Sequence, residues 1–439
     1  MNRKGIICFF ILFSFVRMVS IAQPMDPVLA NKLQKKLDSI RLASNYKGIS
    51  VSIIHPALGS WKGVSGISHA GTPITSDMLF GIASNTKLFT SVLVLKLVEN
   101  NLIRLEDALH QYLPGFKNMD PNITIRQLLN HTSGLADVSS IQGYPDSILT
   151  NPNRIYTATE LMNWLGTPLF APGTDWNYCN TNYLLAGMII EKVTGKSYTQ
   201  FLRDSLLTPL QLDSTFLDVY ESIPFSVAHP WQAGTDNNSV PRISLNSAAW
   251  SAGAMYSTSS EMTQWYQALM NGKVINSNSI KEMTTFVGSG NYGMGIAKTI
   301  VSGRPVWTHG GQIWGGYNSS MMYDPSTGII ICVLINQLPA QAFQVSAQLL
   351  STLISFPVNV ENKTKESMDI AISPNPATQH LFINNLHHEV RYSLINLAGE
   401  SVDVGLTANS INLDRLSPGI YFVKLESQTF CKTFKFFKD

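Results

Sequence analysis

The sequence has few cysteines and few charged residues, and each shortage narrows the classes of protein it can encode. Four cysteines stand far apart in 439 residues, so we expect no disulfide framework, and no spacing of cysteine and histidine suits a zinc site. Charged residues make up 14% of the chain, and the net charge is +2 without a basic stripe or an arginine-rich run. Nucleic acid is therefore not an expected partner.

Long hydrophobic runs are also missing beyond the N-terminus. Residues 6–16 form an apolar run behind Arg3 and Lys4, and small residues follow at Ser20-Ile21-Ala22. This is the pattern of a signal peptide, and the run is about half the length that spans a bilayer. We therefore expect residues 1–22 to be a signal peptide and the mature chain to be exported through the periplasm without a transmembrane segment.

What the sequence does contain is enough apolar material for a large core, since 44% of its residues are hydrophobic. Its length predicts two domains. The first, residues 23–356, begins with a β-hairpin and ends with three strand-like segments and a helix, around a mainly helical middle. This order predicts an α/β (α+β) fold whose antiparallel sheet joins both ends of the domain and carries a helical insertion. A polar linker, residues 357–369, then precedes short alternating strands at 370–439, which predict a small β-sandwich.

The stretch Ser84-Asn85-Thr86-Lys87 carries the clearest chemical signal. In a helix the serine and the lysine share one face, about 60° apart, and an apolar run follows at residues 88–98. Burial without a nearby acid would lower the pKa of Lys87 and place a base beside a nucleophile. Ser44-Asn45-Tyr46-Lys47 has the same spacing but precedes a strand-like segment, which indicates a loop. On this motif alone, a simple helix cap at Ser84 with Lys87 in solvent remains an alternative.

Two further motifs, Tyr178-Cys179-Asn180 and His309-Gly310-Gly311, follow in order. With them the chain resembles the serine β-lactamase and penicillin-binding protein superfamily, especially its branch of class C β-lactamases, esterases, D-aminopeptidases and DD-carboxypeptidases. A Gly-x-Ser-x-Gly elbow, typical of α/β-hydrolases, is absent from the sequence. The resemblance also rests on residues 128–135, 171–173, 184–195 and 251–258.

The resemblance implies a serine hydrolase that works through an acyl-enzyme. Ser84 would attack an acyl carbonyl, and Lys87 would take its proton or stabilise the alkoxide. Tyr178 would pass a proton to the leaving group, with a pKa lowered by the nearby amine. The resemblance implies no metal and no organic cofactor.

The same resemblance implies the groups that bind substrate. Asn180 would hydrogen-bond both substrate and the lysine, and His309 would line the site from an edge strand. The backbone N–H groups of Ser84 and Gln312 would form the oxyanion hole. Gly311, with the glycine before it, would let substrate approach the strand closely.

The third motif bears on the substrate. Typical β-lactamases carry lysine, then threonine or serine, then glycine there, so the ammonium and hydroxyl that could hold a β-lactam carboxylate are missing at His309-Gly310-Gly311. We therefore favour hydrolysis of esters, D-amino-acid peptides or amides. A true β-lactamase and a non-catalytic protein that binds cell-wall ligands remain alternatives. His131 and Ser133, although chemically suited to catalysis, are interpreted as structural, and the Cys179 side chain is expected to point away from the site.

The C-terminal segment has a resemblance of its own. Ser373-Pro374-Asn375-Pro376, with residues 397–400 and 419–423, resembles the C-terminal sorting domain of the type IX secretion system. This implies the type IX machinery as a partner and a secreted or cell-surface location. An immunoglobulin-like or carbohydrate-binding module is the alternative for this segment.

Overall fold

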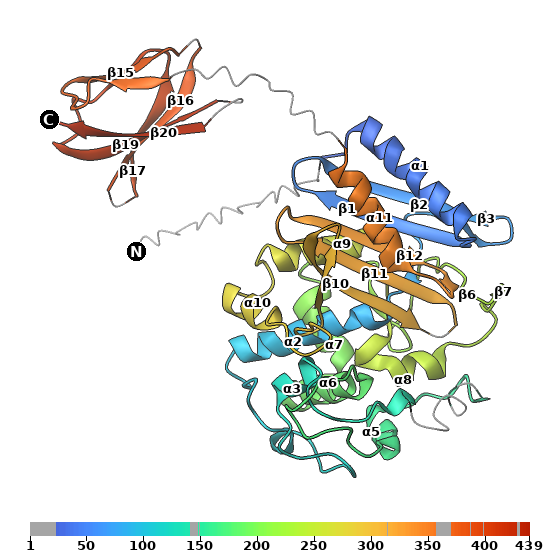
Figure 1. Cartoon of the computed structure of the whole chain (residues 1–439). Coiled ribbons are helices and arrows are strands. Elements are labelled where there is room, and N and C mark those ends of the chain that lie inside the picture. Colours follow the sequence, from blue (N-terminus) through green and yellow to red (C-terminus); the bar gives the residue numbers. More distant parts are fainter. Residues whose placement is uncertain are drawn as a thin grey trace, which may run out of the picture. The chain divides into compact units, whose positions relative to one another are not determined.

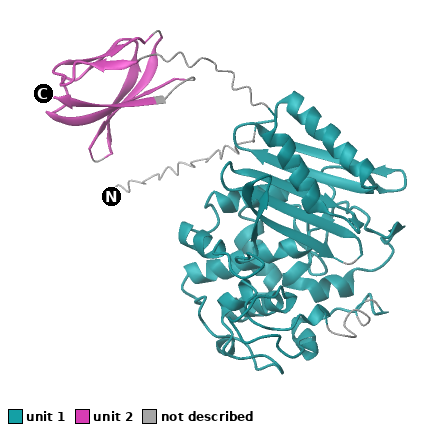
Figure 2. Cartoon of the chain, viewed as in Figure 1, with its two compact units in different colours: residues 1–356 teal, residues 357–439 magenta. Residues whose placement is uncertain are grey.

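The computed structural model describes two compact units, which comprise residues 1–356 and 357–439 (Figure 2). The expected signal peptide and linker, residues 1–22 and 357–369, lie outside the described residues. No helix in the described part of the chain is long and apolar enough to cross a membrane. The described residues are 23–140, 148, 150–313, 315–356, 370–386, 388–397, 399–427 and 431–439.

A seven-stranded antiparallel sheet forms the frame of the first unit (Figure 1). Its strand order is β3-β2-β1-β12-β11-β10-β9, so β1 from the start of the unit pairs with β12 from its end. This confirms the predicted sheet made from both ends of the domain. The strands are β1 (Gly48–His55), β2 (Gly59–His69), β3 (Thr72–Pro73), β9 (Ala297–Val301), β10 (Arg304–Ile313), β11 (Tyr317–Asp324) and β12 (Ile329–Ile335).

Helices cover both faces of this sheet. Successive side chains of each strand point to opposite faces, so each face packs against its own helices. Val51 and Ile53 of β1 belong to a core with α1 (Pro27–Ala43) and α11 (Ala342–Ile354). On the other face Ser50 lies against α9 (Ser259–Met270), where its hydroxyl is 2.9 Å from that of Ser259.

The remaining helices form the insertion below the α9 face (Figure 1). At its centre lies α2, which is apolar nearly all round and buried along almost its whole length, as the sequence predicts. Residues 198–207 form α7 and a π-helical turn. The helices are α2 (Thr86–Glu99), α3 (Ile125–Leu129), α5 (Ala158–Leu161), α6 (Asn180–Thr194), α7 (Tyr198–Leu202), α8 (Ile243–Gly253) and α10 (Ser277–Met283).

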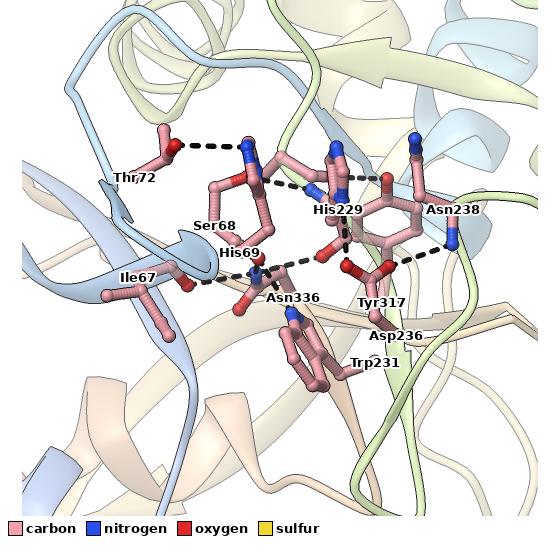
Figure 3. A network of polar contacts seen from close by, with 11 residues as sticks. Ile67, Ser68, His69, Thr72, His229, Trp231, Asp236, Asn238, Tyr317 and Asn336 are labelled. Carbon is pink, nitrogen blue, oxygen red and sulfur yellow. Dashed lines mark hydrogen bonds and ion pairs between the residues drawn. The ribbon is translucent and has the colours of Figure 1, made fainter.

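Two small sheets brace the insertion against the main sheet. One is β4-β8-β5 and the other is β13-β6-β7. A polar network fixes the second one, in which the His69 ring stacks on His229 at 3.9 Å and His229 Nδ1 lies 2.9 Å from Asp236 (Figure 3). The strands are β4 (Phe80–Gly81), β5 (Phe216–Leu217), β6 (Trp231–Gln232), β7 (Thr235–Asp236), β8 (Met255–Ser257) and β13 (Gln337–Leu338).

The second unit is a small β-sandwich, as predicted. Its sheets are β14-β15-β18 and β17-β16-β19-β20, and their inward residues, including Leu381, Leu394 and Val423, form a separate core. The strands are β14 (Ala371–Ser373), β15 (His380–Asn384), β16 (Val390–Asn396), β17 (Ser401–Thr407), β18 (Ser410–Asn412), β19 (Gly419–Glu426) and β20 (Cys431–Lys438).

Candidate active site

Ser84 lies on a tight turn, Ala83–Asn85, that leads into α2. Ala83 has φ of 48°, a backbone conformation that is costly for alanine and that persists only where the surroundings hold it. Ser319 of β11 provides that hold, since its hydroxyl donates to Ile82 O at 2.7 Å and accepts from Asn85 Nδ2 at 2.9 Å. The N-cap positions are held by Ile82 for this turn and by Asn85 for α2, and Lys87 is buried, so the alternative of a helix cap at Ser84 with Lys87 in solvent is wrong.

The amine of Lys87 is wholly enclosed beside this serine. Lys87 has 0% exposure, and Nζ donates to Ser84 Oγ at 3.1 Å, to Asn180 Oδ1 at 2.7 Å and to the Ala252 carbonyl at 2.8 Å. These three acceptors match the three donors of an ammonium. After loss of one proton, two N–H groups can keep Asn180 and Ala252 as partners, and the lone pair then faces Ser84.

The electrostatics of the site favour that neutral form. Burial lowers the pKa of Lys87 from 10.5 to about 7, and the negative charge of Asp137 limits the shift. The prediction of a lysine with a depressed pKa is therefore confirmed. No acid stands near Lys87 along the sequence, but the fold brings Asp137 close from a distant part of the chain.

Asp137 acts on the lysine through Asn180. The Asp137 carboxylate accepts from the Asn180 backbone N–H at 3.0 Å and from its Nδ2 at 2.9 Å, while the amide oxygen faces Lys87. A carboxylate only accepts and an ammonium only donates, so the two neighbours fix the orientation of the amide. Asn180 Nδ2 also donates to Ser139 Oγ at 3.2 Å. The amide donors predicted to bind substrate are thus already bound within the protein.

Tyr178 lies next to the lysine but is not activated by it as expected. Lys87 Nζ is 4.9 Å from the centre of the Tyr178 ring. Burial raises the pKa of Tyr178 well above its usual value, and a hydrogen bond with Ser84 counters this only in part. The expected lowering is therefore wrong, because the cost of placing a phenolate in this enclosed site exceeds the benefit of the amine. The side chain is a phenol that can give a proton.

His309 lies beside the site but has both ring nitrogens occupied. Nδ1 is 2.6 Å from the Gly310 carbonyl and must carry the proton, so Nε2 accepts from the Tyr292 hydroxyl at 2.8 Å. Burial, reinforced by the charge of Lys87, lowers the pKa of His309 to about 3. The predicted substrate contact is therefore not available to these nitrogens, and the structure instead makes His309 a neutral support for the Tyr292 hydroxyl.

The glycines of β10 differ in what they allow. A Cβ on Gly311 would lie 2.3 Å from Ile82 O and from Ser319 Oγ, whereas the nearest atom to a Cβ on Gly310 is 3.9 Å away. The lack of a side chain at Gly311 therefore makes room for the turn that carries Ser84. The prediction was that it would make room for substrate. Pairing of β10 with β9 ends at Thr308, which leaves the following residues at the edge of the sheet beside the site.

Ser84 borders a cavity of about 150 Å³. Ser84, Asn180 and Gln312 all line it, together with apolar side chains of α6 and α8. The structure thus brings the predicted oxyanion residues Ser84 and Gln312 to one cavity. Tyr178 and His309 are not among its described lining residues, and their ring centres are 6.2 Å apart.

His131 braces the segment that carries Tyr178. Its backbone carbonyl accepts from Asn177 N at 3.1 Å, and its ring Nδ1 accepts from Cys179 N at 3.2 Å. The proton must then lie on Nε2, which is buried without a hydrogen-bond partner and belongs to a ring 4.5 Å from that of Tyr178. His131 also has φ of 64°, an uncommon backbone conformation for a residue other than glycine. This residue thus holds the residues on both sides of Tyr178 by hydrogen bonds.

Cys179 contributes no nucleophile. Its thiol is buried, and burial raises its pKa to about 12. The predicted direction of its side chain, away from the site, stays a prediction.

Sequence reasoning missed Asp137, Ala252 and Tyr292. Asp137 stands just after the His131-Thr132-Ser133-Gly134 motif. The signal that could have identified it in the sequence is an acidic residue directly after an apolar Leu-Ala pair. Ala252 contributes a backbone carbonyl, which any residue type supplies, so the sequence holds no signal for it. Tyr292 is identified by its contacts in the structure, with His309 Nε2 and with the rings of His131 and Tyr178.

Comparison with known proteins agrees with this geometry. Residues 371–438 match the family described as secretion system C-terminal sorting domain. Penicillin-binding protein 4 of Amycolatopsis lactamdurans is 28% identical over 71% of this chain and 86% of its own length. Protein flp of Staphylococcus aureus strain MW2 is 31% identical over 58% of this chain, and the match spans about half of that relative, 52%.

Solved structures show the same architecture. A D-stereospecific amidohydrolase from Streptomyces sp. has 29% identity and a TM-score of 0.64, and the match covers 73% of this chain and 97% of that one. D-amino acid amidase from Ochrobactrum anthropi SV3, complexed with L-phenylalanine amide, has 27% identity and a TM-score of 0.66 over 74% of this chain and 99% of that one. The beta-lactamase family model matches residues 44–352, and the chain therefore belongs to the beta-lactamase family.

Proposed function

We propose that the protein is an exported serine hydrolase that cleaves amides or esters through an acyl-enzyme on Ser84. The observation that carries this proposal is the enclosed Lys87 amine, 3.1 Å from Ser84 Oγ and with a pKa lowered to about 7. A lysine of this kind is half neutral near pH 7 and can serve as a general base.

Acylation begins when the neutral Lys87 amine takes the hydroxyl proton of Ser84 as Oγ attacks the acyl carbon. The carbonyl electron pair moves to oxygen, and the backbone N–H groups of Ser84 and Gln312 bind the resulting oxyanion. Donors of this type contribute about 3 kcal/mol each. The tetrahedral intermediate collapses as the leaving group takes the Tyr178 proton, and the Lys87 ammonium then returns a proton to the phenolate.

Deacylation reverses these transfers with water as the nucleophile. The Lys87 amine takes a proton from water as the water oxygen attacks the ester carbon. The proton passes to Ser84 Oγ when the acyl bond breaks, which releases a carboxylic acid and restores the hydroxyl. Every proton is returned, so the cycle needs no other reactant.

Amides and esters of amino acids are the substrate class that we favour. Two of the similar solved structures are described as a D-stereospecific amidohydrolase and a D-amino acid amidase. The neutral state of His309 supports this choice, since a histidine with a pKa of about 3 cannot replace the cation expected to hold a β-lactam carboxylate.

A covalent probe tests the proposal. A fluorophosphonate or penicillin probe should label the wild-type chain and fail to label Ser84→Ala, because the attacking oxygen is gone. Ser44→Ala is the matched control, since exposed Ser44 begins the other Ser-x-x-Lys sequence and lies at the C-terminal end of α1. Equal labelling of wild type and Ser84→Ala would contradict the proposal.

We also propose that the second unit directs the enzyme to the type IX secretion system. The match of residues 371–438 to a secretion system sorting domain supports this role. An N-terminal signal peptide would direct the chain to the periplasm. The β-sandwich would then act as the sorting signal for export to the cell surface or the medium.

A further inference from the structure

A second and larger cavity adjoins the catalytic one. Its volume is about 390 Å³, against about 150 Å³ for the cavity that contains Ser84. Ile148 and Leu245 line both, so these two side chains form the boundary between them. A cavity of about 150 Å³ already holds a benzene ring, so the second cavity has room for a bulky group.

The lining of this second cavity is mainly apolar. Proline and aliphatic side chains, including Pro152, Pro230 and Val240, form much of it. Arg242 is the charged residue among the described lining residues, and its charge is balanced by Asp218, whose carboxylate lies 3.7 Å from Nε. The guanidinium also lies 4.9 Å from the centre of the Tyr256 ring. This environment suits an apolar group better than an anion.

The outer wall of the cavity is fixed in place. Gly315 donates its N–H to Gln232 Oε1 at 3.1 Å, and its carbonyl accepts from Asn237 Nδ2 at 3.4 Å. The hairpin that carries these residues is anchored in turn by the His229–Asp236 contact and by Trp231 Nε1, which donates to Ser68 O at 2.7 Å (Figure 3). Because this wall is held by hydrogen bonds before a ligand binds, binding loses little further conformational entropy.

The strand β10 gives the cavity a direction relative to the reaction. Tyr178, the proton donor to the leaving group, lies near the His309 end of this strand. Gln312 follows at the catalytic cavity, and Gly315, just beyond the strand, lines the second cavity. A substrate laid along β10 therefore directs its leaving group toward Tyr178 and its acyl substituent toward the second cavity.

Resting on the proposed function, we infer that the second cavity is the binding site for a bulky apolar substituent on the acyl portion of the substrate. The substrate class is an amide or ester whose acyl group carries an aromatic ring or a branched chain, as an aromatic amino acid does. Two side chains set this preference. Val240 forms part of the cavity wall, and Leu245 shapes the entrance from the catalytic cavity.

Two esters with one leaving group test this inference in the full chain. Nitrophenyl phenylacetate should be cleaved with a kcat/KM at least about tenfold above that of nitrophenyl acetate, after correction for their rates in buffer. Val240→Trp should bring this ratio close to one, because an indole would fill the cavity. Leu102→Trp is the control and should keep the ratio, since Leu102 is 56% exposed, like Val240 at 50%, and lines neither cavity.

The other outcomes separate the two proposals. Turnover of both esters without an acyl preference, or a preference that survives Val240→Trp, overturns the inference and leaves the proposed function standing. The inference also fails if Val240→Trp instead alters the ratio between acetates with nitrophenyl and naphthyl leaving groups. Absence of turnover together with absence of Ser84-dependent labelling contradicts the proposed function itself.

Discussion

Lys87 is unfavourable to bury as a cation, since a charge in an enclosed site loses its hydration. The protein reduces that penalty in two ways, by supplying three acceptors and by letting the amine lose its proton near neutral pH. The folded-state pKa lies below the ordinary value of 10.5, so between about 7 and 10.5 the unfolded chain binds more protons. Lys87 therefore makes the folded state more stable as pH rises through this range.

The same shift predicts the pH dependence of catalysis. If the neutral amine is the base, as proposed, kcat/KM should rise about tenfold per pH unit below pH 7 and level off above it. A pH–rate profile with a nitrophenyl ester measures this directly. Lys87→Arg, which stays charged, should be inactive throughout, and a flat wild-type profile between pH 5.5 and 8.5 would contradict the assignment of the base.

His131 gives a second prediction at this scale. Its ring holds Cys179 N, so His131→Ala should displace Tyr178 and slow amide hydrolysis about 100-fold. Nitrophenyl esters should be slowed much less, because their leaving group needs no proton. Kinetics with both substrate types measure the difference.

His131→Asn is the matched variant for this test. Asparagine tolerates a positive φ and offers an oxygen near the position of Nδ1, so it should restore most amide hydrolysis. An equal loss on amides and esters in His131→Ala would show that the residue supports only folding.

At the scale of elements, the contact between β10 and the turn before α2 decides the shape of the site. Gly311→Ala should lower the free energy of unfolding by about 1–3 kcal/mol, because its methyl group meets backbone Ile82 O at 2.3 Å. Gly310→Ala is the control and should change stability much less, since its methyl group would make only an ordinary van der Waals contact, 3.9 Å from Ser319 O. Thermal unfolding measures both, and equal losses would contradict the assigned contact.

The pairing of elements was partly visible in the sequence. The hairpin β1–β2 and the strands β10, β11 and β12 are strand-like segments in the sequence, so their existence and order were predicted. The helix α1 was not predicted, although Leu29, Leu33 and Leu37 follow a helical spacing. The strand β9 is short and mostly exposed or half-buried, and its pairing with β10 identifies it.

At the scale of the whole molecule, the proposed catalytic and sorting roles fall on separate units with separate cores. Deletion of residues 357–439 should therefore leave the kcat/KM of the first unit within about twofold of the full chain. In a host with type IX machinery, the truncated enzyme should be retained inside the cell envelope. Activity assays on cell fractions measure both effects.

Full-length Ser84→Ala is the complementary control. It should reach the surface or medium like wild type and be inactive there, because the substitution leaves the second unit intact. Surface delivery of the truncated enzyme would contradict the sorting role of that unit.

The sequence by itself determined what depends on neighbours along the chain. Ser84 and Lys87 meet because one helical turn brings residues three apart together, and strand and turn patterns set the order of the sheet. The sequence also reveals two units, because a polar linker at residues 357–369 separates the first domain from the short alternating strands of the second.

Only the tertiary structure decided the protonation states and the partners of the site. Asp137, Asn180 and Ala252 reach Lys87 across large sequence separations, and burial by distant elements keeps Tyr178 protonated and His309 neutral. The physical reason is that desolvation depends on everything packed around a group, whereas a motif records only what stands next to it in the chain.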